Sequence, residues 1–252
     1  MTQGALPFKY EEEKKDFGLT GFAGLFLFLD LLYKSNFRQM VNRHVSAKAD
    51  KDGWSDFHVL LSLILLNLAG GDSVDDIRKL ECDPGLVRFF KHLDLRNAFG
   101  RNRKKLKKQW ANGRKNAFPS ASSIFRYLSL FHNASSEQER KKNKAYIPRS
   151  TPDLKGLSKV NQELLELLQL NRPQSIATID MDATLVESNK QSALFSYKKF
   201  KGYQPLNSWW WEQDWMIYSE FRDGNVPAGF DQKRVFEETL SCLPQGVETV
   251  YL

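Results

Sequence analysis

One stretch, Ile176-Ala-Thr-Ile-Asp-Met-Asp-Ala-Thr-Leu-Val186, constrains the fold of this chain more than any other. It is an apolar, β-branched run that carries two carboxylates two residues apart. Because side chains alternate between the faces of a strand, Asp180 and Asp182 are expected on the same face. Two like charges on an apolar strand repel each other, so a divalent cation with oxygen ligands is their expected partner. The alternative is a strand end at which both carboxylates are simply hydrated.

Basic residues gather in one part of the chain. Residues 96–144 contain fourteen Lys or Arg and two Glu, whereas the net charge of the whole chain is +7. This block predicts a polyanionic partner, most often nucleic acid, although a solvated charge run is the alternative. The Asn and Gly residues within it indicate a loop rather than a continuous helix. The side chains expected to contact DNA phosphates are Arg101, Arg103, Lys104, Lys105, Lys107, Lys108, Arg114, Lys115 and Arg126.

Residues 1–134 have the pattern of a helical domain. Dense apolar spacing predicts helices over 19–33 and 54–68, and Gly70-Gly71 ends the second of these. Asp83-Pro84 starts a short helix, and Pro119-Ser120 starts another that carries Arg126. Short helices and tight turns are typical of a DNA-binding module of helix-turn-helix type. A small helical bundle without a ligand has the same pattern.

In the second half of the chain, the spacing of apolar residues changes from a helical pattern to a strand pattern. Residues 135–153 are polar and basic and are predicted to be a linker, and 154–170 form an amphipathic helix. Strands are then expected at 176–186, 193–200 and 215–221, followed by a helix at 232–243 and a strand at 247–252. This order predicts an α+β chain whose second domain, 154–252, has antiparallel strands and then a parallel return. Trp209, Trp210, Trp211 and Trp215 fall in or beside a strand connection, where packing in the core or a hairpin is the favoured role.

The composition is that of a globular protein, with 41% hydrophobic residues. Cys82 and Cys242 lie far apart without metal-type spacing, which favours two reduced thiols. The apolar runs are too short or too interrupted to span a bilayer, and no secretory signal is evident. A cytoplasmic protein without a membrane partner is therefore expected.

Two families could account for the acidic motif. Asp180-Met-Asp182-Ala-Thr184 resembles the first motif of haloacid-dehalogenase-type phosphatases, in which the first Asp is a nucleophile. That fold needs a helical crossover directly after the motif, whereas residues 188–211 are predicted to form a hairpin.

A second resemblance covers nearly the whole chain and is more specific. In order and spacing, the following segments resemble DDE transposases of bacterial insertion sequences, in the branch numbered thirteen-eighty: Gly18-Leu-Thr20, Leu68-Ala-Gly-Gly71, Asp75-Asp-Ile-Arg-Lys-Leu80, Thr178-Ile-Asp-Met-Asp-Ala-Thr184, Gly202-Tyr-Gln-Pro-Leu206, Phe221-Arg-Asp-Gly-Asn225 and Val250-Tyr-Leu252. The resemblance implies a ribonuclease-H-like catalytic core that cleaves DNA and transfers strands with Mg²⁺ or Mn²⁺. It also implies that the partner is double-stranded DNA of the terminal inverted repeats and is compatible with a homo-oligomer. The location that it implies is the bacterial cytoplasm, in association with the nucleoid.

The same resemblance assigns the acidic residues. It makes Asp182 the first catalytic metal ligand, with Asp180 as the alternative or as an auxiliary ligand. In the family, the run that matches Val250-Tyr-Leu252 leads to a second catalytic Asp, and a Glu follows on a later helix; neither is present in this sequence. The chain is therefore expected to be a C-terminally truncated, catalytically incomplete transposase. A non-enzymatic DNA-binding fragment that regulates transposition is the alternative.

Overall fold

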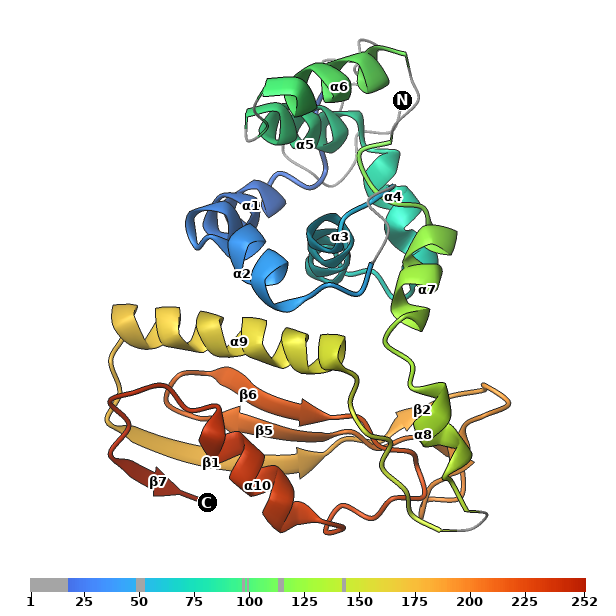
Figure 1. Cartoon of the computed structure of the whole chain (residues 1–252), viewed down its shortest axis with the longest axis vertical. Helices are drawn as coiled ribbons and strands as arrows, with labels where there is room; N and C mark the ends of the chain where they lie inside the picture. Colours follow the sequence, from blue (N-terminus) through green and yellow to red (C-terminus); the bar gives the residue numbers. More distant parts are fainter. Residues whose placement is uncertain (1–17, 49–52, 97, 99, 113–115, 142–143) are drawn as a thin grey trace, which may run out of the picture. The chain divides into compact units, whose positions relative to one another are not determined.

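The computed structural model describes residues 18–48, 53–96, 98, 100–112, 116–141 and 144–252 (Figure 1). Packing divides the chain into two compact units. The helical unit contains residues 1–30 and 58–126, and the sheet unit contains residues 31–57 and 127–252. This division differs from the predicted boundaries after residues 134 and 153, because residues 31–57 pack with the second half of the chain. No helix within the described ranges is both long and apolar enough to cross a bilayer.

Helices and their connections make up the described part of the helical unit. They are α1 (Leu25–Lys34), α3 (Asp56–Leu68), the 3₁₀ helix η1 (Val74–Asp76), α4 (Ile77–Glu81), α5 (Pro84–Arg96), α6 (Gly100–Ala111) and α7 (Ala121–Ser129), of which α1, α3 and α7 continue into the sheet unit. Their core consists of fully buried apolar side chains: Leu61, Leu65, Leu80, Leu86, Phe90, Phe118 and Ile124. The helices predicted from apolar spacing are thus present.

Asp83 explains why α5 begins where the sequence predicted it. Its Oδ1 accepts a hydrogen bond of 2.7 Å from the amide of Leu86, which satisfies one free amide in the first turn of the helix. Its Oδ2 accepts a hydrogen bond of 3.0 Å from the amide of Gly21, so the same carboxylate fixes the chain just before α1. Pro84 occupies the first helical position, as predicted.

The structure of the basic block differs from the one that the sequence predicts. We predicted a loop over residues 96–115, but residues 100–111 form the helix α6. Asn102 lies in its first turn, where a residue of low helix propensity is tolerated, and Asn112 lies just past its end. The Lys and Arg residues between these positions are good helix formers and outweigh the local turn signals.

Apart from the ends of α1, α3 and α7, the described part of the sheet unit consists of helices, strands and their connections. The helices are α2 (Phe37–His44), α8 (Ala134–Gln138), α9 (Pro152–Asn171) and α10 (Gln232–Ser241). The strands are β1 (Ile176–Ala183), β2 (Val186–Glu187), β3 (Leu194–Phe195), β4 (Lys201–Tyr203), β5 (Leu206–Trp210), β6 (Trp215–Glu220) and β7 (Thr249–Tyr251). One sheet has the order β6-β5-β1-β7 and the other the order β2-β4-β3.

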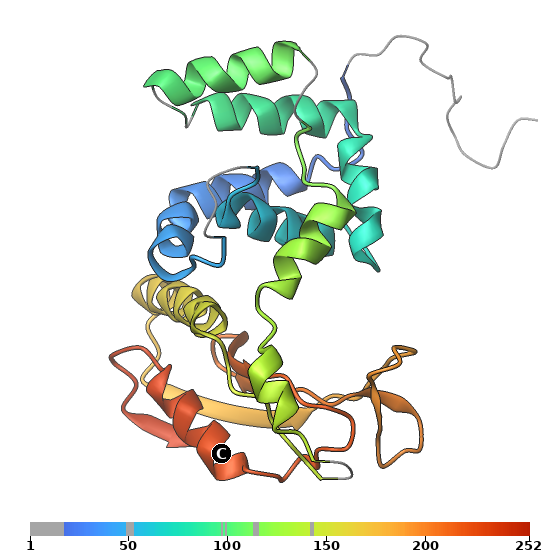
Figure 2. The same ribbon diagram turned by 45° about the vertical axis from the view of Figure 1, so that its right-hand side comes forward.

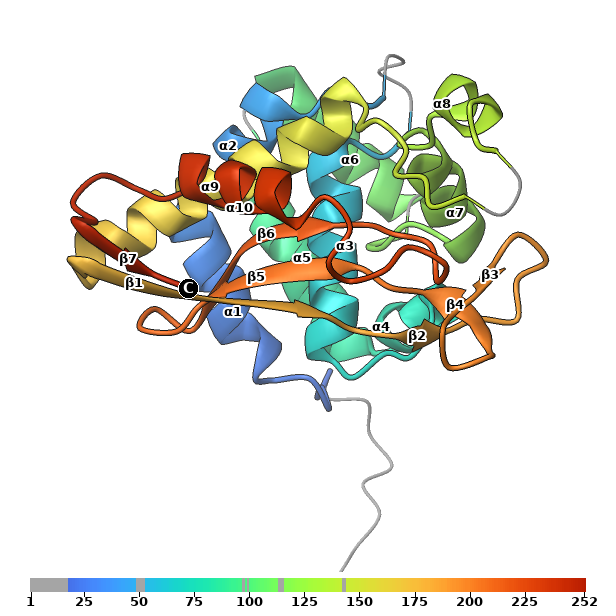
Figure 3. The same cartoon turned by 90° about the horizontal axis from the view of Figure 1, so that it is seen from below.

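The larger sheet confirms the predicted order of strand, strand, strand, helix and strand. β1, β5 and β6 are antiparallel neighbours, α10 follows, and β7 returns parallel to β1. Helices α9 and α10 both cover one face of this sheet (Figure 3). Leu165 of α9 and Phe236 of α10 pack there with Ala177, Ile179 and Trp210.

The connection after β1 corrects a second prediction. We expected the second strand at 193–200 and a turn at 202–205. The second strand of the larger sheet is instead β5, and the expected strand and turn form the small sheet β2-β4-β3. Gly202 permits this pairing, because a Cβ at that position would lie 2.3 Å from the carbonyl oxygen of Val186. Trp209 and Trp210 consequently belong to β5 rather than to a connection.

Residues 135–153, predicted to be a linker, make specific contacts within the sheet unit. They contain part of α8, and the Tyr146 hydroxyl lies 2.7 Å from the Ser136 Oγ. Arg140 forms an ion pair of 2.8 Å with the buried Asp223, in the loop that follows β6. Burial raises the pKa of the Asp223 carboxyl, although the nearby Arg140 opposes this rise.

Candidate functional site

The acidic pair lies on the face of β1 opposite to the helices. Asp180 and Asp182 are exposed, whereas Ala177 and Ile179, which alternate with them, are buried against α9 and α10. The expectation that the two carboxylates share a face is confirmed. β1 is a central strand, between β5 and β7, so the pair is presented from the middle of the sheet.

Neighbouring strands supply polar and aromatic groups to the same face. Asp180 is paired across the sheet with Trp209, and Asp182 is paired with Asn207. The Ser219 hydroxyl of β6 donates a hydrogen bond of 2.7 Å to Oδ1 of Asn207. Because this bond occupies the amide oxygen, the amide nitrogen of Asn207 is the end that can donate to an oxygen bound near Asp182.

A third carboxylate, that of Glu212, contacts β1 at Thr178, two residues before Asp180. Glu212, in the turn after β5, accepts hydrogen bonds from the amide and the hydroxyl of Thr178. Burial opposes the charged form of this carboxyl, but the hydrogen bonds from Thr178 outweigh it and hold the pKa of Glu212 below its ordinary value. Glu212 therefore anchors the turn to β1 as an ionised carboxylate.

The acidic face has the chemistry of part of a divalent-cation site. Magnesium is usually held by one or two carboxylates together with water and substrate phosphate oxygens, and Asp180 and Asp182 can supply these carboxylates. The described residues contain no group of three or more His, Cys, Asp or Glu side chains that could hold a metal. The acidic pair thus fits a site that is completed by other oxygen ligands.

The predicted phosphate-binding residues concentrate on α6. Arg101, Arg103, Lys104, Lys105, Lys107 and Lys108 are all exposed, and the helix contains no acidic residue. Consecutive cations on a helix spread around most of its circumference, so α6 presents positive charge in several directions. The helical unit holds α6, whereas the sheet unit holds the acidic pair.

The other predicted cations are less concentrated. Arg126 is exposed in the last turn of α7, where its Nε donates a hydrogen bond of 3.2 Å to the carbonyl of Ser122. Arg114 and Lys115 lie outside the residues that the structure describes. The structure thus brings six of the nine predicted cations together on one helix.

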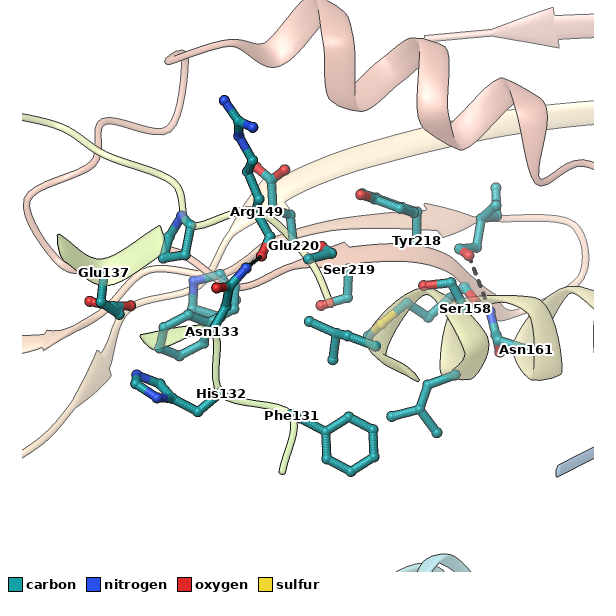
Figure 4. A pocket seen from close by; sticks show the side chains of 18 residues that line it. Phe131, His132, Asn133, Glu137, Arg149, Ser158, Asn161, Tyr218, Ser219 and Glu220 are labelled. Atoms are coloured by element: carbon teal, nitrogen blue, oxygen red, sulfur yellow. Dashed lines mark hydrogen bonds between the residues drawn. The ribbon is translucent and has the colours of Figure 1, made fainter. Parts of the chain in front are cut away.

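A groove of about 600 Å³ lies along the edge strand β6 (Figure 4). It is lined by β6, by the start of α9 and by residues 131–133 and 148–150. Its two carboxylates, Glu137 and Glu220, are already paired with arginines. Asn161, which also lines the groove, donates hydrogen bonds to the carbonyls of Met216 and Ile217. Among the predicted site residues that the structure describes, none lines this groove.

Sequence reasoning missed the groups that accompany the acidic pair. Asn207 lies in β5 and Glu212 lies in the turn after it, whereas the sequence predicts a connection between strands over these residues. Their proximity to β1 depends on strand register, which local pattern does not specify. The sequence Leu-Asn-Ser-Trp-Trp of β5 has no regular alternation of apolar and polar residues, so its aromatic residues were the one signal that favoured a strand.

Residues 184–205 contain strands and turns but no helix. The helical crossover that a haloacid-dehalogenase-type phosphatase requires after its first motif is therefore not present after β1.

Comparison with known proteins identifies one family. The sequence model described as transposase DDE domain group 1 matches residues 17–249. No curated protein matches this chain, and no solved structure does.

Proposed function

This chain belongs to the family of transposase DDE domains of group 1, and from that premise we propose that it binds transposon-end DNA and contributes β1 carboxylates to cleavage and strand transfer. The observation that carries this proposal is the exposure of Asp180 and Asp182 on the face of a central strand opposite to α9 and α10. An insertion-sequence transposase of the thirteen-eighty branch is the finer assignment that we propose.

We assign Asp182 as the principal metal ligand and Asp180 as an auxiliary one. Asp182 lies beside the amide of Asn207, a neutral group that can orient a phosphate oxygen without competing for the cation. Asp180 lies across from Trp209 of the neighbouring strand β5, one step further from Asn207. Bound Mg²⁺ or Mn²⁺ would supply activation of the attacking oxygen and stabilisation of the leaving oxygen.

Two further carboxylates would complete such a site. The resemblance places one of them after the strand that corresponds to β7 and the other on a later helix. β7 runs parallel to β1 with Tyr251 opposite Thr178, so a chain continuing in this direction would approach the level of Asp180. Because Asp180 and Asp182 are only part of such a site, we expect metal binding by these two residues alone to be weak.

Metal binding can be tested without an activity assay. Terbium(III) bound near Asp180 should luminesce when tryptophan is excited, because Trp209 is its cross-strand neighbour. We expect Mg²⁺ to displace it, and we expect Asp182→Asn to abolish the signal. Asp214→Asn, in the exposed turn after β5, is the control and should leave the signal unchanged. Equal signals from both variants would contradict the assignment.

We assign duplex binding to α6. Phosphate-driven affinity falls with salt, and each lost phosphate contact reduces the slope of log K against log salt by about 0.9. Replacing Lys104 and Lys107 by Gln should therefore weaken binding and lower the slope by about 1.8 between about 50 and 200 mM salt. The matched variant, Lys155→Gln with Lys159→Gln on the exposed side of α9, should change neither quantity.

A DNA-binding regulator without catalysis is the second candidate. It is favoured by the six exposed cations of α6, which can bind phosphates without a metal. Duplex binding with no terbium signal in the unsubstituted chain would support this candidate over the enzyme. If the unsubstituted chain showed neither duplex binding nor a terbium signal, both candidates would be contradicted.

A further inference from the structure

The segment between β1 and β5 has a surface that neither the acidic pair nor α6 accounts for. The chain leaves β1 at Ala183 and, after two residues, enters the small sheet β2-β4-β3. This sheet extends beyond the end of β1 that carries Asp182 (Figures 2 and 3). We call residues 188–203 the aromatic hairpin.

The aromatic hairpin combines exposed rings with positive charge. Phe195 is 62% exposed and Tyr197 is 71% exposed. Residues 188–205 contain no Asp or Glu, and they contain four lysines: Lys190, Lys198, Lys199 and Lys201. Large exposed aromatic side chains surrounded by like charges are not expected from packing alone, and they indicate a binding surface for an anionic partner with flat apolar groups.

Each exposed ring has an ammonium group beside it. Nζ of Lys198 lies 5.8 Å from the centre of the Tyr197 ring, and Nζ of Lys201 lies 5.7 Å from the centre of the Phe195 ring. A nucleotide carries a flat base and a negative phosphate separated by a sugar. A ring with an adjacent ammonium matches these two groups, because the base can stack while the phosphate is neutralised.

The backbone of the aromatic hairpin is held in place. The amide of Ser196 donates a hydrogen bond of 2.8 Å to the carbonyl of Phe200, and the amide of Lys199 donates one of 3.0 Å to that of Ser196. Lys199 adopts a left-handed conformation with φ of 67°, which a lysine rarely adopts. Ser196, which lies between Phe195 and Tyr197 in the sequence, is buried. Little backbone ordering is therefore needed when a ligand binds.

We propose that the aromatic hairpin binds unpaired bases of single-stranded DNA. This inference rests on the proposed function, because it assumes that DNA is handled at the end of β1 that bears Asp182. Bases in a duplex are stacked inside the helix and cannot reach a protein ring, whereas bases of a frayed or cleaved end can. Stacking on Phe195 and Tyr197 would hold such an end near the acidic strand.

The test compares single-stranded and duplex DNA of about 12 nucleotides, a length that one small binding module can cover. Fluorescence anisotropy of labelled thymidine oligonucleotides is measured with the full chain. We expect the double variant Phe195→Ala with Tyr197→Ala to bind the single strand about tenfold or more weakly. Duplex binding, which we assign to α6, should change by less than about twofold.

Two control variants separate stacking from other effects. Trp211→Ala removes a ring that is 71% exposed in the turn after β5, and it should leave single-strand affinity unchanged. Phe195→Trp with Tyr197→Trp keeps both rings and should bind as tightly as the unsubstituted chain. Thermal unfolding of each variant shows whether the fold is retained, and Lys198→Gln with Lys201→Gln replaces the alanine variant if it is not.

The outcomes distinguish this inference from the proposed function. Unchanged single-strand binding in the alanine variant, or equal loss of single-strand and duplex binding, would overturn the role of the aromatic hairpin. Absence of duplex binding by the unsubstituted chain would instead count against the proposed function. Weaker single-strand binding by the alanine variant, with rescue by the tryptophan variant, would support the hairpin even if no metal binds.

Discussion

At the scale of single residues, Arg222 shows what the Phe221-Arg-Asp-Gly-Asn225 segment does. Its side chain is fully buried, and its Nε donates a hydrogen bond of 2.9 Å to Glu220. Its Nη1 donates hydrogen bonds to the carbonyls of Ala228 and Phe230, at 3.3 and 2.8 Å. One guanidinium therefore fixes the loop that leads from β6 to α10.

Replacing this side chain should be costly. Arg222→Met leaves buried loop carbonyls without a donor, whereas Glu220 keeps its ion pair with Arg234, so the free energy of unfolding should fall by about 1–3 kcal/mol. Urea unfolding followed by tryptophan fluorescence measures this change. Lys233→Met, at an ammonium that is exposed and 3.8 Å from Glu237, is the control and should cost less than about 1 kcal/mol. Similar losses from both variants would contradict the role of Arg222.

The two cysteines should differ in reactivity. Cys82 is exposed, whereas burial raises the pKa of the half-buried Cys242 thiol. Because the thiolate is the reactive form, Cys242 should react more slowly with a thiol-specific reagent at neutral pH. The rate at Cys242 should rise as pH increases, since a raised pKa keeps the thiol protonated to higher pH. Mass spectrometry after timed labelling measures both rates, with Cys82→Ser as the control. Equal rates would show that Cys242 is accessible.

At the scale of elements, α2 and α9 approach each other closely at Gly156. A Cβ at this position would lie 2.0 Å from the carbonyl oxygen of His44, so no other residue fits without movement of the backbone. Glu163 accepts a hydrogen bond of 2.6 Å from Arg43 further along the same contact. Residues 31–57 are thereby joined to the sheet unit.

Gly156→Ala tests whether this contact is required. Overpacking a tight contact costs about 1–3 kcal/mol, and we expect a loss of this size because the clash involves backbone atoms. Chemical denaturation gives the change in free energy. Ser158→Ala, an exposed position in the same helix, is the control and should be nearly neutral. A neutral Gly156→Ala would show that α2 moves away from α9 at little cost.

At the scale of the whole molecule, the chain consists of two units with separate cores. Leu165 is fully buried in the core of the sheet unit, whereas Leu65 is fully buried in the helical unit. Leu165→Ala should destabilise the sheet unit by about 2–5 kcal/mol. Amide exchange measured by mass spectrometry should then accelerate in β1 and β5 but not in α4 and α5. Leu65→Ala is the reciprocal control, and uniform acceleration in either variant would show one cooperative unit.

The sequence by itself determined the periodic elements and the acidic pair. Helices α3 and α9, strands β1 and β6, and the shared face of Asp180 and Asp182 follow from spacing, because helix and strand periods are local properties. The family resemblance was likewise carried by short segments in order, and the match over residues 17–249 confirms that the chain is a transposase DDE domain.

Tertiary structure alone decided which segments became partners. Residues 193–205 formed the small sheet because Gly202 permits close pairing with β2, and Leu206–Trp210 became the second strand of the larger sheet through its register with β1. The turn signals around α6 were overridden by the helix propensity of its cations. Asn207 and Glu212 reached the acidic face through strand register, which depends on packing across the sheet and is not encoded by the spacing of any one segment.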